Sequence, residues 1–119
     1  LGFIFSHVTE YFTQKGYEVV VIDNCYEGSN PKIINNSFRL HQKDLANLET
    51  VDIILGEKPD YLVHAGGITD VDHSIREPGK VLKNNILANI HSFEAARHLK
   101  PLKKFLYVST DEIYGECEQ

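Results

Sequence analysis

Short β-rich runs alternate with segments of helical periodicity along the chain, and this alternation limits the fold more than any other feature. The clearest run is Tyr17–Ile22, which is rich in valine and isoleucine and is followed directly by Asp23. Runs of this kind are typical of strands buried on both faces of a parallel sheet, and the segments between them suit crossover helices. The pattern therefore predicts an α/β fold with a doubly wound parallel sheet.

Local start and stop signals give the expected elements. Asn47 is expected to cap a helix that Gly56 stops, and Pro78 suits the first turn of a long helix that ends before Pro101. That long helix carries an apolar stripe that we expect to be buried, formed by Leu82, Ile86, Ile90, Phe93 and Ala96. The other expected elements are a helix over Phe5–Lys15 and strands over Tyr17–Ile22, Phe38–His41, Tyr61–His64 and Phe105–Val108.

Composition excludes several classes of protein. The 119 residues are 42% hydrophobic and 24% charged, which predicts one small globular domain without a linker. A net charge of -5 gives no basic face for a phosphate backbone, so we expect no nucleic-acid partner. No apolar run approaches the roughly 18 residues of a membrane helix, which predicts no membrane association. Cys25 and Cys117 have neither metal-site nor disulfide-framework spacing, which favours the reducing cytoplasm and no metal.

The start of the chain has the parts of a dinucleotide site. Gly2 opens a helix, and Asp23 ends the next strand at a spacing close to the roughly 20 residues typical of such sites. A glycine lets the backbone approach a pyrophosphate at the helix N-terminus, and the carboxylate accepts hydrogen bonds from ribose hydroxyls. The same carboxylate would repel a 2′-phosphate, so the spacing predicts NAD rather than NADP.

Polar side chains follow the last strand, where an open parallel sheet has its ligand crevice. Ser109, Thr110, Asp111 and Glu112 place a hydroxyl, an acid and a second carboxylate side by side. On residue content alone, a polar turn explains this segment as well as a site for proton chemistry does.

At several motifs the chain resembles the extended short-chain dehydrogenases/reductases, the NAD-dependent nucleotide-sugar epimerases and dehydratases. The matching segments are Gly2–His7, Val20–Asn24, Asp44-Leu45, His64–Gly67, Val71–Ile75, Asn84–Ile86 and Ser109–Gly115. The resemblance implies a Rossmann-like fold and a nucleotide-diphosphate sugar as substrate, with a homodimeric parent enzyme. It also implies a set of NAD-binding residues: Gly2, Phe3, Ile4, Asp23, Asn24, Asp44, Leu45, Ala65, Gly66, Gly67, Asn85 and Ser109.

The segment Ser109–Gly115 is similar to the S-T-D-E-[IV]-Y-G of dTDP-glucose and UDP-glucose 4,6-dehydratases. This resemblance implies that NAD removes a hydride from C4 of the hexose and returns it to C6 after water has been lost. Glu112 would be the base at C5, Asp111 would protonate the departing C6 hydroxyl, and Thr110 would hold the C4 oxygen. Two alternatives stay open: a 4-epimerase of the same family, and a non-catalytic remnant that binds a nucleotide.

The chain departs from the family pattern in three ways. The first strand and first glycine lie outside it, Phe5 stands where the third glycine is usual, and the Y-x-x-x-K pair would follow Gln119. We therefore expect residues 1–119 to be a partial NAD-binding domain, inactive alone, with the first strand, the C-terminal half and the substrate domain missing. Any compact form of residues 1–119 is then expected to show the strands ending at Asp23 and His64 either separated by a cleft or forced into a pairing that the family fold does not use. The aromatic ring of Phe5 is expected to crowd the contact between helix and strand.

Overall fold

The structure is a computed structural model that describes residues 1–26, 29 and 38–115, with only the backbone at Asp111. Cys117 lies outside the described residues, as does most of the loop between 25 and 37, and Cys25 is a free thiol. The elements in chain order are α1 (Phe3–Gln14), β1 (Val20–Asp23), β2 (Arg39–Gln42), α2 (Glu49–Glu57), β3 (Tyr61–His64), α3 (Val71–Arg76), α4 (Pro78–His98), β4 (Lys104–Tyr107) and the 3-10 turn η2 (Asp111–Tyr114).

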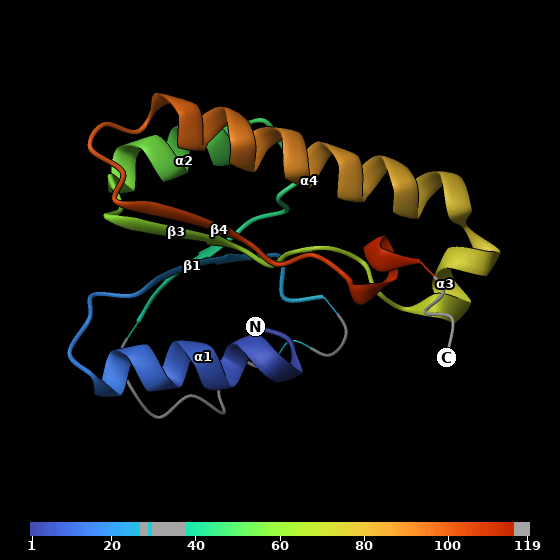
Figure 1. Ribbon diagram of the computed structural model, residues 1–119, viewed down its shortest axis with the longest axis horizontal. Coiled ribbons are helices and arrows are strands. Elements are labelled where there is room, and N and C mark those ends of the chain that lie inside the picture. The colour runs from blue at the N-terminus through green and yellow to red at the C-terminus, as the bar shows by residue number, and fades with distance from the viewer. Residues whose placement is uncertain (27–28, 30–37, 116–119) are drawn as a thin grey trace.

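All strand pairs are parallel, as the sequence predicts. β1 pairs with β2 in a register that places Asp23 opposite Gln42, and β3 pairs with β4 so that His64 lies opposite Tyr107. The loops that leave the labelled strands at their carboxyl ends therefore gather on one edge, together with the start of α1 (Figure 1).

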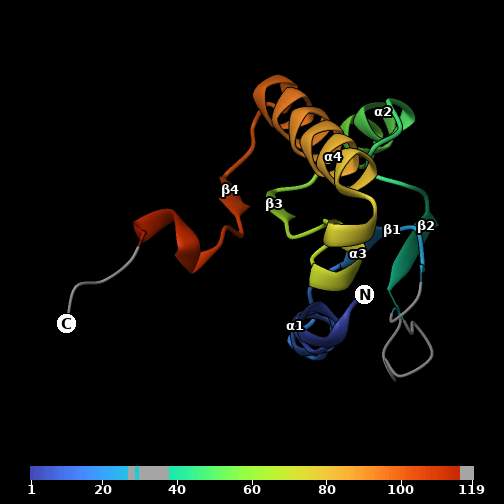
Figure 2. The same ribbon diagram turned by 90° about the vertical axis from the view of Figure 1, so that its right-hand side faces the viewer.

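The two strand pairs form separate sheets. Among the described residues, β1 bonds to β2 and β3 bonds to β4, and no ladder joins β1 to β3. Figure 2 shows the pairs side by side, with β1 and β3 as the two inner strands. Of the two arrangements expected for these inner strands, a forced pairing with each other is not present among the described residues.

Helices lie on both faces of the strands, which is the doubly wound arrangement. α1 lies on one face, and α2 and α4 lie together on the other (Figure 1). The buried core is on the α2 and α4 side, where Ile22 of β1 and Leu62 of β3 pack against one cluster formed by Val51, Ile54, Ala95 and Leu99. A single cluster therefore supports both strand pairs.

The face of α4 that is buried differs from the one predicted. Leu82 and Ile86 are 63% and 47% exposed, and Ile90 and Phe93 are also exposed. The buried face instead carries small and polar residues, namely Val81, Ala88, His91, Ser92 and Ala95. Short side chains let the helix lie close to the strands, and the polar ones bond the loop after β2 (His91) and His64 at the end of β3 (Ser92). Leu82, Ile86 and Ile90 are left exposed, whereas Phe93, although 46% exposed, packs its ring on Phe105 and Tyr107 of β4.

Several element ends also differ from the sequence prediction. α1 begins at Phe3 rather than Phe5, β1 begins at Val20 rather than Tyr17, and both ends of α2 differ. Leu48 rather than Asn47 is the N-cap of α2, and the helix continues through Gly56 to Glu57, where Lys58 adopts a left-handed conformation with φ 49°. α3 was not predicted, because it is short and lacks an apolar stripe. Asp70 begins it by accepting a hydrogen bond from the backbone nitrogen of His73 at 2.5 Å.

In the part of the chain that the structure describes, none of the helices is long and apolar enough to cross a membrane.

Candidate functional site

The predicted site residues gather at the carboxyl edge of the strands. Asp23 ends β1, Asp44 and Leu45 follow β2, Ala65–Gly67 follow β3, and Ser109 and Thr110 follow β4. In a doubly wound sheet the ligand crevice lies outside this edge, where the strand order reverses.

Gly2 is the N-cap of α1 and leaves the start of the helix open. A Cβ built on Gly2 meets nothing within 4 Å among the described residues, and no side chain caps the first turn. Phe3 and Ile4, the next two residues, are exposed. The free amides of a first helical turn, together with the helix dipole, favour an anion such as a pyrophosphate.

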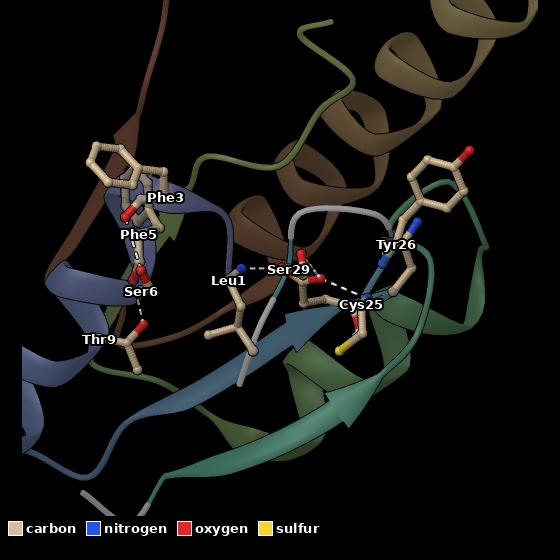
Figure 3. Close-up of polar contacts among 10 residues, drawn as sticks. Leu1, Phe3, Phe5, Ser6, Thr9, Cys25, Tyr26 and Ser29 are labelled. Carbon is tan, nitrogen blue, oxygen red and sulfur yellow. Dashed lines mark hydrogen bonds and ion pairs between the residues drawn. The ribbon is translucent and has the colours of Figure 1, made fainter. Parts of the chain in front are cut away.

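Phe5 does not interrupt α1, although crowding was expected there. The helix runs unbroken from Phe3 to Gln14, and the ring of Phe5 is half-buried. The buried residues of α1 are Ser6 and Thr9, whose hydroxyls donate to the carbonyls of Phe3 and Phe5 at 2.8 Å each (Figure 3). Small side chains therefore occupy the most buried positions of the helix, and Phe5 lies beside them.

Asp23 is held by three donors (Figure 3). Its Oδ1 accepts from the backbone nitrogen of Cys25 at 2.7 Å and from the hydroxyl of Ser29 at 3.0 Å, and its Oδ2 accepts from the nitrogen of Leu1. Burial raises the pKa of Asp23, whereas the hydrogen bonds that it accepts, including those from Cys25 and Ser29, lower it. The carboxylate is therefore ionised at neutral pH.

The same carboxylate keeps room for a ligand hydroxyl. A carboxylate offers about four acceptor sites, and the described residues of this chain fill three of them on Asp23. The remaining site suits a ribose hydroxyl, whereas the negative charge disfavours a 2′-phosphate.

The loops after β2 and β3 touch through Leu45 and Gly66. A Cβ built on Gly66 would lie 2.1 Å from Cδ1 of Leu45, so the leucine side chain occupies the space that any other residue at position 66 would fill. In the first loop, Oδ1 of Asp44 accepts from the backbone nitrogen of Ala46 at 2.9 Å, which fixes the turn that carries Leu45.

Asn85 on α4 holds the far end of the second loop. Its side chain makes two hydrogen bonds to the backbone of Ile68, and a Cβ on Gly67 would lie 3.4 Å from its Oδ1. Asn85 is half-buried and is thus a polar anchor bonded to backbone. Its neighbours Leu82 and Ile86 are exposed, however, rather than buried as expected.

His64 is a packed residue, and both of its ring nitrogens have hydrogen-bond partners. Nε2 lies 2.7 Å from Oδ1 of Asn89, Nδ1 lies 2.8 Å from Oγ of Ser92, and the ring stacks on Tyr107. Burial lowers the pKa of His64 more than the bond to Asn89 raises it, so the ring is neutral at neutral pH. A neutral ring fits when Nε2 donates to Asn89 and Nδ1 accepts the single hydroxyl hydrogen of Ser92, which is then shared with the Ala88 carbonyl 2.9 Å from the same oxygen.

The predicted catalytic segment forms a tight turn after β4. Thr110 is the N-cap of η2, and its Oγ1 accepts from the backbone nitrogen of Glu112 at 3.3 Å. Ser109, Thr110 and Glu112 are exposed, and the side chain of Asp111 lies outside the described residues. In Figure 2 this turn, in red, lies on the β4 side of the molecule and away from α1.

The structure therefore brings some of the predicted residues together, whereas the turn after β4 (η2) lies away from α1 (Figure 2). Leu1, next to Gly2, meets Asp23, and Leu45 meets Gly66 beside Asn85. Among the described residues, no group of three or more His, Cys, Asp or Glu side chains is arranged to hold a metal ion.

Several supporting residues were not predicted from the sequence. Ser29 holds Asp23, Asn89 and Ser92 hold His64, and His91 donates from Nδ1 to the carbonyl of Leu45 at 2.9 Å. The signal for His91 and Ser92 is the spacing of Ala88 and Ala95, which marks the buried face of α4 and includes positions 91 and 92.

A parallel, doubly wound arrangement with an open helix start beside a strand-end carboxylate defines a dinucleotide-binding domain. The model of the NAD dependent epimerase/dehydratase family matches residues 1–119, and the chain belongs to this family. Both the predicted cofactor and the predicted fold class agree with the family.

Named relatives cover two activities. The chain is 36% identical over 125 residues to dTDP-D-glucose 4,6-dehydratase of Dictyostelium discoideum, which covers 96% of this chain and 28% of that protein. A solved structure of UDP-glucose 4-epimerase with UDP-glucose from Thermotoga maritima is 30% identical, with a TM-score of 0.84, covering 99% of this chain and 38% of that one. A Thermus thermophilus UDP-glucose 4-epimerase in complex with NAD is 28% identical with a TM-score of 0.80, covering 92% and 35%. The chain thus spans well under half the length of these relatives.

Proposed function

We propose that the protein carrying this chain is an NAD-dependent nucleotide-sugar 4,6-dehydratase that converts dTDP- or UDP-glucose to the 4-keto-6-deoxy sugar. Residues 1–119 would be part of its NAD-binding domain. The observation that carries the proposal is the sequence Thr110-Asp111-Glu112 on a tight turn at the carboxyl end of β4. The likeness to a 4,6-dehydratase over 96% of the chain supports it.

The residues at the strand edge fit NAD. The open first turn of α1 at Gly2 would hold the pyrophosphate, Asp23 with Asn24 would hold the adenosine ribose, and Asp44-Leu45 would contact the adenine. The remaining cofactor-binding residues would be Phe3, Ile4, Ala65, Gly66, Gly67, Asn85 and Ser109. Bound NAD supplies a hydride acceptor that later returns the hydride.

The residues of the turn after β4 would handle the protons. Glu112 removes the proton from C5 of the hexose, Asp111 protonates the departing C6 hydroxyl, and Thr110 hydrogen-bonds the C4 oxygen. Two adjacent carboxyl groups suit opposite roles, because the charge of one raises the pKa of the other. The 3-10 turn supports this assignment, because consecutive residues of an extended strand point to opposite faces and those of a turn do not have to.

A 4-epimerase is the second candidate, and the likeness of the fold to solved UDP-glucose 4-epimerases favours it. Such an enzyme would keep the same NAD site and Thr110 but would not eliminate water. For either activity we propose a nucleotide-diphosphate sugar as substrate. We also propose a homodimeric parent enzyme, which the exposed apolar stripe of α4 supports.

Product analysis separates the candidates. The full-length protein is incubated with NAD and either dTDP-glucose or UDP-glucose, and the products are identified by mass spectrometry and NMR. A 4-keto-6-deoxy product supports the dehydratase, and the 4-epimeric sugar with no loss of water supports the epimerase. Saturable NAD binding with neither product would support a non-catalytic nucleotide-binding protein.

A further inference from the structure

His91 connects the buried face of α4 to the loop after β2. Its side chain is 8% exposed, and its Nδ1 lies 2.9 Å from the carbonyl oxygen of Leu45. A carbonyl oxygen can only accept, so Nδ1 carries the hydrogen and donates it. This bond joins residues 46 positions apart in the chain.

The Leu45 carbonyl has one strong side-chain donor among the described residues, and that donor is His91. The hydroxyl of Thr50 lies 3.4 Å from the same oxygen, but it makes its shorter contact, 2.7 Å, with the carbonyl of Asn47. A single hydroxyl hydrogen serves one acceptor well, so Thr50 does not replace His91.

The orientation of Leu45 matters because its side chain fills the space above Gly66. With Cδ1 of Leu45 2.1 Å from the position of a Cβ on Gly66, the two loops are in direct contact. α4 also holds the second loop through Asn85 and Ile68. One helix therefore sets the positions of both loops, with His91 fixing the first and Asn85 the second.

We propose that His91 is a positioning residue for the adenine half of the dinucleotide, acting through the Leu45 backbone without touching the ligand itself. This inference rests on the proposed NAD-binding function, in which Asp44 and Leu45 contact the adenine. Loss of the His91 bond leaves the Leu45–Ala46 peptide held at its nitrogen by Asp44 but not at its carbonyl, so the adenine loop loosens and its contact with Gly66 weakens.

The first arm of the test needs no ligand. Hydrogen exchange of the backbone is measured on the full-length protein for residues 43–48, in His91→Leu, His91→Asn and the unsubstituted chain. His91→Leu should speed exchange in this loop, whereas His91→Asn, whose side-chain amide can replace the Nδ1 donor, should restore protection. His98→Leu, an exposed histidine on the same helix, is the matched control. Equal protection in all variants overturns the positioning role.

The second arm measures affinity for NAD, AMP and nicotinamide mononucleotide. His91→Leu should weaken NAD and AMP about 3- to 10-fold, the range expected for one lost buried hydrogen bond, and leave nicotinamide mononucleotide unchanged. His91→Asn should recover most of the affinity. An equal loss for all three ligands, or no loss for AMP, overturns the inference. If the unsubstituted protein binds no NAD, the proposed function and the adenine role both fail, while the exchange measurement still decides whether His91 positions Leu45.

Discussion

Asn85 holds the backbone of Ile68 with both ends of its side-chain amide. Its Oδ1 accepts from the Ile68 nitrogen at 2.8 Å, and its Nδ2 donates to the Ile68 carbonyl at 2.9 Å. The amide thus pairs with both backbone polar groups of Ile68, as a neighbouring strand would. A shorter or a charged side chain cannot make both hydrogen bonds.

Replacing Asn85 should therefore destabilise the protein. Asn85→Leu removes both hydrogen bonds and leaves the Ile68 groups unpaired, at a cost of about 1–3 kcal/mol in the free energy of unfolding. Asn85→Asp is the matched variant, since it keeps the acceptor but turns a second oxygen toward the Ile68 carbonyl. Urea unfolding should show both variants to be less stable, and a stability equal to that of the unsubstituted protein would contradict the assigned role.

Asp23 should set the choice between NAD and NADP. Hydrogen bonds from Cys25 and Ser29 lower the pKa of Asp23 and favour its charged form, so it should repel the 2′-phosphate of NADP. The unsubstituted full-length protein should bind NAD more tightly, and Asp23→Ala should narrow the difference. Asp23→Asn is the closer control, because it removes the charge but keeps the size. Equal affinities for both cofactors in the unsubstituted protein would refute this prediction.

The contact between Leu45 and Gly66 predicts a coupled pair of mutations. Gly66→Ala places a methyl group where the leucine side chain lies, and overpacking of this kind costs about 1–3 kcal/mol. In a Leu45→Ala background the same change should cost much less, which a double-mutant cycle on the free energy of unfolding would show.

A second glycine provides the control for that cycle. Gly56 lies inside α2, and a Cβ there meets nothing within 4 Å among the described residues. Gly56→Ala should raise stability by up to about 1 kcal/mol, because glycine disfavours a helix interior. If Gly66→Ala behaved like Gly56→Ala, the close contact with Leu45 would be wrong.

His64 should make stability fall at mildly acidic pH. Burial lowers its pKa in the folded state, whereas in the unfolded chain a histidine takes up a proton near its usual pKa of about 6.5. The unfolded state then binds more protons, so the free energy of unfolding decreases as the pH falls from about 6.5 toward the lowered pKa. His64→Gln should flatten this part of the stability curve measured in urea. A slope that His64→Gln leaves intact would assign the effect to other groups.

Glu112 tests the chemistry of the turn after β4. In the full-length enzyme, Glu112→Gln should abolish exchange of the C5 proton with solvent while the initial hydride transfer to NAD stays measurable, because the base acts only after the ketone has formed. Glu94→Gln, which changes an exposed glutamate on α4, should retain product formation. A near-normal rate of 4-keto-6-deoxy product in Glu112→Gln would exclude this role.

The sequence predicted the strands better than it predicted the buried face of α4. β3 lies at Tyr61–His64 as expected, and Pro78 begins α4, because both rest on strong local signals. Apolar periodicity misidentified the inner face of α4. That face carries short side chains that allow close approach to the strands, together with His91 and Ser92, which hydrogen-bond to residues outside the helix. The partners, Leu45 and His64, lie far from α4 in the sequence, so the periodicity of the helix does not reveal them.

For the candidate site, motif spacing located the residues at the strand ends but not the ones that support them. The bond from Ser29 to Asp23 depends on how a polar loop folds back over a strand end, and the bond from His91 to Leu45 depends on helix packing. Both are products of tertiary structure rather than of any local preference.

The separation of the two sheets has a consequence for how the molecule comes apart. β1 with β2 and β3 with β4 share no backbone ladder among the described residues, and the two pairs are joined by the cluster on α2 and α4 and by the contact of Leu45 with Gly66. In residues 1–119 taken alone, opening both contacts would let each strand pair exchange its amides as an independent unit. Gly2 and Asp23 lie at the start of α1 and the end of β1, whereas Gly66 and Ser109 follow β3 and β4. A dinucleotide that contacts all four residues would therefore hold the two strand pairs together.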